Sequence, residues 1–148
     1  MRLLAMLGTA VGLLLAGCLP DPARVQAARL LDQLVQAHAA LQAAAQAGPA
    51  GDVSATCDTI GGVDTRLTGE PGLADLRPSW PALRAATDDL LAACGQVRLL
   101  QIPSPDTPAV RDARDRWQAG AQRELAQACR QLGAAAASLD RPRPDCGA

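Results

Sequence analysis

The chain has 148 residues, and its 14 basic residues nearly balance 15 acidic ones, which gives a net charge of −1. This length suits a single domain. The balanced charge argues against nucleic-acid binding, because contacts with phosphates need a concentrated cationic face. Phe and Tyr are absent, so stacking on bases would depend on Trp80 and Trp117 alone. We therefore expect no nucleic-acid partner.

Residues 1–17 have the composition of an export signal. A short positive start, Met1-Arg2, precedes an almost unbroken apolar run over residues 3–16. This run is shorter than the roughly 20 residues that a membrane-spanning helix needs. A charged start followed by a short apolar run is typical of a secretory signal peptide. We therefore predict that residues 1–17 are a leader that is removed on export.

The apolar run closes with Leu15-Ala16-Gly17-Cys18, which resembles the lipobox of bacterial lipoproteins. The resemblance implies that the Cys18 thiol receives a diacylglyceryl group, that cleavage separates Gly17 from Cys18, and that the new amino group is often acylated as well, as with palmitate. Two or three acyl chains hold a protein firmly on a membrane, since each buried methylene contributes about 0.8 kcal/mol. The alternatives are an uncleaved anchor and a buried cysteine. The residue after Cys18 is Leu19. An Asp at this position would resemble the inner-membrane retention signal of enterobacterial lipoproteins, so Leu19 favours an outer membrane where the cell has one.

Residues 18–148 are predicted to form one all-α domain, because apolar residues recur there at helical spacing. Residues 18–22 form a short tether, and a first helix is expected over residues 23–47, after which Gly and Pro interrupt the pattern. A second helix is expected to begin near Asp52, a good N-cap, although Gly61 and Gly62 weaken it. The expected buried stripes are Ala27, Leu31, Leu34, His38, Leu41 and Ala45 in the first helix, and Val53, Cys57, Ile60, Val63 and Leu67 in the second.

Two further helices complete the pattern. Residues 68–81 are rich in Gly and Pro and predict a loop with one turn at residues 73–76, after which Ser79 caps a third helix. A fourth helix is expected over residues 108–139, and the tail 140–148 is not helical because of its prolines, Pro142 and Pro144. The expected seams are Trp80, Leu83, Thr87, Leu90, Cys94 and Val97 in the third helix, and Val110, Ala113, Trp117, Ala121, Leu125, Ala128, Leu132, Ala135 and Leu139 in the fourth. Four amphipathic helices with short connections favour an up-down-up-down four-helix bundle.

Four cysteines remain once Cys18 carries lipid, and an even number in an exported chain predicts disulfides. Four cysteines allow three connectivities, and the bundle topology chooses between them. It places Cys57 and Cys94 at the end far from the anchor and Cys129 and Cys146 at the near end, while a disulfide needs Cα atoms within about 7 Å. The predicted pairs are therefore Cys57–Cys94 and Cys129–Cys146. The sequence contains no C-x-x-C motif, the cysteine spacing that is typical of metal sites and redox sites, so these roles are not favoured.

His38 is the only histidine of the sequence. As a functional residue it would be a general base or a metal ligand. A half-buried histidine bonded to a neighbouring helix is the favoured interpretation, because the sequence offers no recognisable nucleophile for a base to activate. Asp88 and Asp89 point to different parts of a helix surface, and the arginines around Asp112 and Asp115 predict a salt-bridged exposed face. We therefore expect no enzymatic activity, no metal site and no cofactor.

The leader and the absence of a recognisable reactive site predict a lipid-anchored protein on the extracytoplasmic side of the bacterial cell envelope. Its expected role is non-catalytic, either structural or in protein interaction, for instance within an envelope protein complex. The alternative is a small-ligand or inhibitor-type binding module, with a pocket between helices near His38, Trp80 and Trp117. A cavity beside these three residues would favour the alternative, and a filled core would argue against it.

Overall fold

The structure of the protein is a computed structural model that describes residues 21–48, 52–69 and 79–146. These residues form four helices, α1 (Pro22–Ala47), α2 (Ser54–Gly69), α4 (Ser79–Leu100) and α5 (Pro108–Ser138), and no strand. The predicted all-α fold is therefore confirmed. The predicted leader, its cysteine Cys18 and the predicted turn at residues 73–76 lie outside the described residues.

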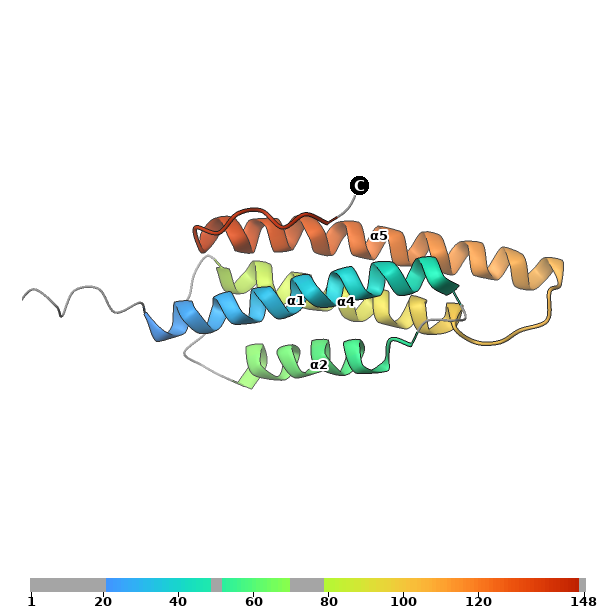
Figure 1. Cartoon of the computed structure of the whole chain (residues 1–148), viewed down its shortest axis with the longest axis horizontal. Coiled ribbons are helices and arrows are strands. Elements are labelled where there is room, and N and C mark those ends of the chain that lie inside the picture. The colour runs from blue at the N-terminus through green and yellow to red at the C-terminus, as the bar shows by residue number, and fades with distance from the viewer. Residues whose placement is uncertain (1–20, 49–51, 70–78, 147–148) are drawn as a thin grey trace, which may run out of the picture.

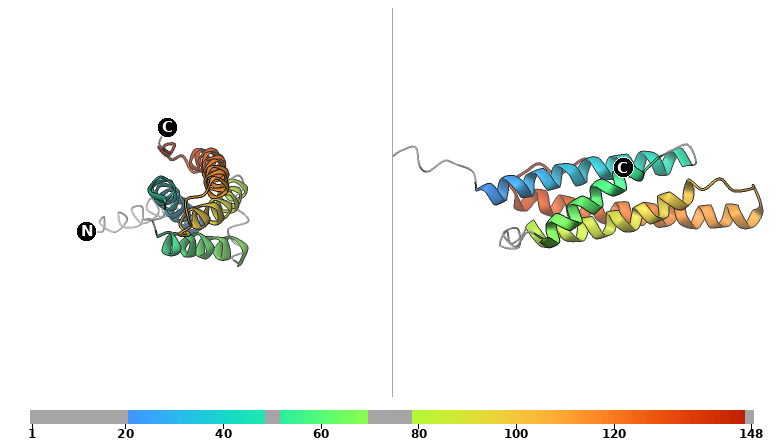
Figure 2. Two further views of the ribbon diagram at one scale, coloured as in Figure 1. Left: turned by 90° about the vertical axis from the view of Figure 1, so that its right-hand side faces the viewer. Right: turned by 90° about the horizontal axis from the view of Figure 1, so that it is seen from below.

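Successive helices run in opposite directions, which confirms the up-down-up-down order (Figure 1). The helices α1 and α4 contact each other, and each also contacts both α2 and α5. The contact between α4 and α5 is the most extensive, and α2 lies on the opposite side of the α1–α4 pair from α5. Figure 2 shows that α2 crosses its neighbours obliquely, whereas the other three helices are nearly aligned. The bundle is therefore three long aligned helices with a shorter, tilted fourth.

Capping side chains account for where the helices begin and end. Asp21 accepts a hydrogen bond from the Ala23 amide (3.0 Å) ahead of α1, and Gly48 ends this helix with a φ of +60°, which glycine adopts without strain. The predicted cap Asp52 accepts from the Ser54 amide at 2.9 Å. These contacts satisfy amides and carbonyls that have no partner within a helix.

Leucine and alanine dominate the core. Every residue of the stripes predicted for α1 and α2 is buried, and the stripe of α1 is wider than predicted because Leu30, Ala37 and Ala44 are buried as well. Six alanines of α4 and α5 have no exposed surface, namely Ala86, Ala93, Ala121, Ala128, Ala135 and Ala136. Side chains this small let two helices approach closely, which accounts for the extensive α4–α5 contact.

The predicted seam of α5 is wrong over its first turns. Val110, Ala113 and Trp117 are only partly buried, and the first buried residue of this helix is Gly120. The reason is geometric, because this part of α5 projects beyond the ends of α1 and α4 (Figure 1). From Ala121 to Leu139 the predicted seam is buried as expected.

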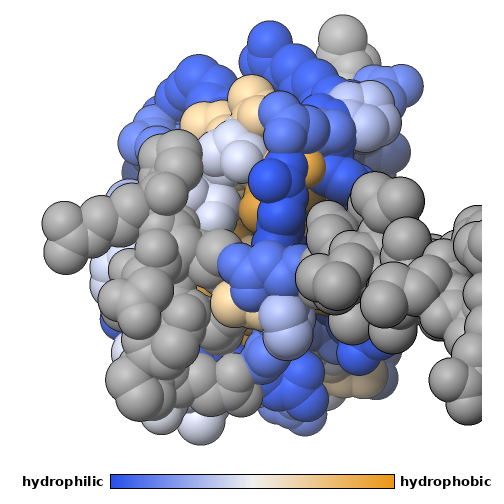
Figure 3. All heavy atoms as spheres, turned by 90° about the vertical axis from the view of Figure 1, so that its left-hand side faces the viewer, coloured by the Kyte–Doolittle hydropathy of each residue, from blue (hydrophilic) through white to orange (hydrophobic). Residues whose placement is uncertain are grey.

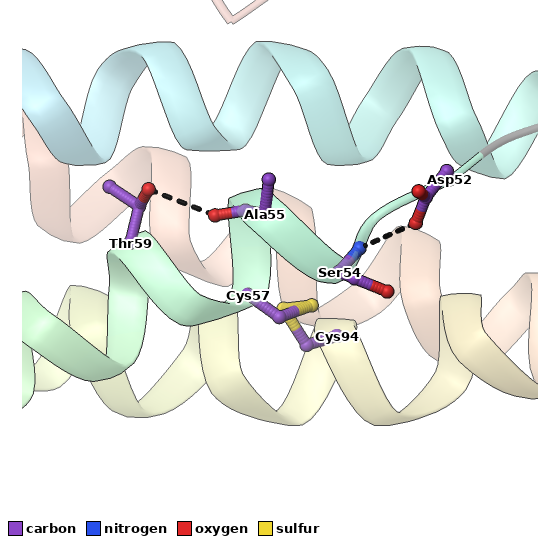
Figure 4. The surroundings of a disulfide bond; sticks show 6 residues. All are labelled: Asp52, Ser54, Ala55, Cys57, Thr59 and Cys94. Atoms are coloured by element: carbon purple, nitrogen blue, oxygen red, sulfur yellow. Dashed lines mark hydrogen bonds between the residues drawn. A yellow bond between two sulfur atoms is a disulfide. The ribbon is translucent and has the colours of Figure 1, made fainter.

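Both predicted disulfides are present. Cys57 and Cys94 join α2 to α4, with Cα atoms 5.9 Å apart (Figure 4). Cys129 and Cys146 join α5 to the tail, with Cα atoms 6.0 Å apart. The tail is not helical over residues 140–146 and runs back along α5 (Figure 1). Each disulfide therefore fastens a segment at the edge of the bundle to a long helix.

Ion pairs link the segment that follows α5 to α1. Arg24 pairs with Asp140, and Arg141 donates to Asp32 at 2.8 Å. Figure 3 shows this end of the molecule, where hydrophilic residues make up most of the described surface and hydrophobic ones show between them. Exposed pairs of this kind contribute at most about 1 kcal/mol each, so they position the start of the tail more than they stabilise the bundle.

Removing the α2–α4 disulfide by Cys57→Ala with Cys94→Ala is expected to lower the free energy of unfolding by about 4 kcal/mol, because the loop that it closes restricts the unfolded chain. The pair Cys129→Ala with Cys146→Ala opens a shorter loop, with a separation of 17 residues against 37. Its expected cost is about 3 kcal/mol. Urea unfolding followed by circular dichroism measures both. A double variant as stable as the unaltered protein would contradict the prediction.

Candidate functional site

A groove of about 440 Å³ lies between α1 and α5. This volume falls in the range of ligand-binding pockets in proteins. The groove is lined by His38, Gln42, Ala45, Gln46, Gln118, Gln122, Leu125, Ala126, Cys129 and Cys146. None of these residues carries a formal charge when the histidine is neutral. The groove therefore offers amide groups and small apolar surfaces together with one disulfide.

Four glutamines supply most of the polar atoms of the groove. Gln42 and Gln46 are one turn apart on α1, and Gln118 and Gln122 are one turn apart on α5. Residues four apart share one face of a helix, so each helix presents a pair of amides. The sequence does not single out these glutamines, because Gln118 and Gln122 lie among the charged residues of α5, as on an ordinary solvent-exposed helix face. Their spacing was visible in the sequence, whereas the packing of α1 beside α5 was needed to bring the two pairs to one groove.

His38 is buried beside the groove, with 4% of its surface exposed. Its Nε2 lies 3.0 Å from the carbonyl oxygen of Leu125 on α5. Burial lowers the pKa of the imidazole below its ordinary value, and the bond to the Leu125 carbonyl opposes this shift. A neutral ring that donates from Nε2 has an acceptor at Nδ1. The interpretation of His38 as a histidine bonded to a neighbouring helix is confirmed, and the residue is more fully buried than expected.

The two tryptophans do not line the groove. The Trp80 indole donates to the Leu67 carbonyl of α2 at 3.2 Å, and its ring packs against the core. Trp117 is partly buried, in the first third of α5. The pocket predicted between His38, Trp80 and Trp117 is therefore not formed by these three residues together, because they belong to different parts of the bundle.

Asp88 and Asp89 of α4 have different surroundings. Asp88 is exposed and lies 3.7 Å from Arg84, whereas Asp89 is partly buried, as their adjacent positions predicted. Burial raises the pKa of the Asp89 carboxyl, and repulsion from Glu124 raises it further. The sequence predicts that Asp112 and Asp115 of α5 pair with the arginines around them. One of these arginines, Arg111, instead donates a hydrogen bond to Asp106 in the loop before α5, at 2.9 Å.

Within residues 21–48, 52–69 and 79–146, no group of three or more His, Cys, Asp and Glu side chains is placed to hold a metal ion. None of the helices in these ranges is both long and apolar enough to cross a membrane. No protein-family model, curated protein sequence or solved structure matches the chain.

Acidification is expected to destabilise the protein through His38. Because the folded-state pKa lies below the ordinary value of 6.5, the unfolded chain binds more protons than the folded one between the two pKa values. The free energy of unfolding then falls as the pH is lowered through about 6.5 towards the folded-state pKa. The variant His38→Gln keeps an N–H donor for the Leu125 carbonyl and does not titrate. Urea unfolding from pH 7.5 to 5 should show a smaller loss in the variant, and parallel curves would contradict the assignment.

Proposed function

We propose that this protein is a lipid-anchored component of the bacterial cell envelope, with a non-catalytic role in protein interaction. The observation that carries the proposal is the run Leu15-Ala16-Gly17-Cys18 after a charged start and a short apolar segment. The resemblance to a lipobox makes Cys18 the acylated residue and Gly17–Cys18 the cleaved bond. Leu19 favours the outer membrane where the cell has one.

The two disulfides support an extracytoplasmic location. Cys57–Cys94 and Cys129–Cys146 account for every cysteine in the described part of the chain. Disulfides persist in exported proteins and are rare in the reducing cytosol. Since α1 begins at Pro22, a chain anchored through Cys18 would hold the bundle close to the lipid surface.

The chemistry of the groove supports binding as the role. Its lining supplies amides, a histidine with a lowered pKa and small apolar groups, which suit recognition by hydrogen bonding. A small-ligand or inhibitor-type module remains the second candidate, because the groove lies beside His38 as that hypothesis requires. The positions of Trp80 and Trp117 away from the groove favour the interaction role over this candidate.

Replacing the lipid acceptor by Cys18→Ala in the full chain is expected to abolish labelling with radioactive palmitate in a Gram-negative host. It should also move the protein out of the membrane fraction, because the acyl chains supply the membrane affinity. Intact mass measures the same event, since the wild-type protein from membranes should begin at Cys18 and carry two or three acyl groups.

The matched control is Cys57→Ala with Cys94→Ala, which also removes cysteines and should keep both the label and the membrane association. Palmitate labelling that survives Cys18→Ala, or a membrane-derived mass that includes residues 1–17, would contradict the proposal.

A further inference from the structure

We propose that the groove between α1 and α5 binds an extended, uncharged segment of a partner polypeptide, chiefly through the segment's main chain. The inference rests on the proposed role in protein interaction and specifies the chemistry of the partner. Three observations carry it, namely the spacing of the groove's glutamines, the absence of charge in its lining, and the extended tail that already lies beside it.

The spacing of the glutamines matches the repeat of an extended chain. Gln42 and Gln46 on α1, like Gln118 and Gln122 on α5, are separated by one helical turn, a rise of about 6 Å. In an extended chain, main-chain groups that point to the same side recur every two residues, or about 6.7 Å. A glutamine amide is both a donor and an acceptor. Gln118 and Gln122 can therefore bond the N–H and C=O groups of alternate residues of such a segment, and Gln46 lines the groove opposite them on α1.

The uncharged lining of the groove disfavours the binding of ionised side chains. All ten lining residues are uncharged when His38 is neutral, and burial keeps the pKa of this histidine low. An ionised group that entered would lose hydration without meeting a counter-charge, which is costly. The apolar part of the lining, Ala45, Leu125 and Ala126, instead suits small side chains such as alanine. The segment that fits is therefore uncharged.

The protein's own tail lies beside the groove, held to the bundle by arginine side chains and by the Cys129–Cys146 disulfide. The tail runs along α5 (Figure 1), and its Arg143 lies against Gly133, where a Cβ atom would be 3.2 Å from Nε of the arginine. Arg141 bonds to Asp32, so the tail also contacts α1. The tail reaches the groove at Cys146, which is part of the lining. Cys146 therefore marks one end of the groove, and a partner segment would lie beyond this point, between α1 and α5.

The experiment compares defined probes by saturation-transfer NMR with the full chain, isolated from membranes and placed in lipid nanodiscs, with empty nanodiscs subtracted. The first probe is acetyl-Ala-Ala-Ala-Ala-amide, and the second is the same peptide methylated on its internal amide nitrogens, which removes main-chain donors. We expect saturable transfer to the first probe and at least tenfold weaker binding of the second. Acetyl-Ala-Glu-Ala-Glu-amide tests the exclusion of charge and should also bind at least tenfold more weakly.

The variant Gln118→Leu with Gln122→Leu should weaken binding of the first probe by about tenfold or more, since each neutral hydrogen bond changes affinity by a factor of about five. The matched control is Gln127→Leu, an exposed glutamine of α5 that does not line the groove, and it should bind as the wild type does. If the double variant does not fold, Gln46→Leu tests the α1 side in the same way, and the comparison of the two alanine probes does not depend on any variant.

Three results would overturn the inference. They are no transfer to the alanine peptide, equal binding of the methylated peptide, and saturable binding of a neutral disaccharide in place of the peptide, which would identify a small-molecule site. The anchoring proposal fails separately, through palmitate labelling and membrane association. If the chain proves to be unanchored, the same NMR comparison applies to the soluble protein.

Discussion

Alanine side chains without exposed surface lie along α4 and α5, and the close approach that they permit is the constraint on which the rest of the bundle depends. With Ala93 on α4 and Ala128 on α5 fully buried, two long antiparallel helices pack over much of their length. The leucine stripe of α1, which includes Leu34 and Leu41, then packs against this pair. An interior of small residues leaves little room for a ligand within the core. Binding surfaces are therefore expected in surface grooves between helices.

The disulfides fasten the two segments that the core holds least. The helix α2 is short, contains Gly61 and Gly62 and crosses its neighbours at an angle, and Cys57 joins it to α4. The tail has no helix and lies on the surface of α5, where Cys146 holds it. Covalent links of this kind act mainly by restricting the unfolded chain. The second link also fixes one edge of the groove, because both of its cysteines belong to the lining.

The groove and the anchor suggest how the molecule would present itself to a partner. The helix α1 begins at Pro22, only a few residues after the proposed lipid site. The His38–Leu125 bond joins α1 to α5, and burial favours the neutral form of the histidine beside the groove. A lipid anchor would confine the protein to two dimensions, which raises its effective concentration for any partner in the same membrane. Weak recognition through main-chain hydrogen bonds would then suffice.

The sequence by itself determined the helices, their alternating direction, most of the core stripes and both disulfide pairs. Each of these follows from local periodicity, from short connections, or from the ends of the bundle at which the cysteines lie. Only the tertiary structure decided where α5 loses its neighbours, because burial at Val110 and Trp117 depends on how far α1 and α4 extend. It also decided the groove, since Gln46 and Gln122 are distant in sequence and share one site only through the packing of α1 beside α5. A periodic pattern reports which face of a helix is apolar, whereas the partner of a polar face is set by contacts between distant segments.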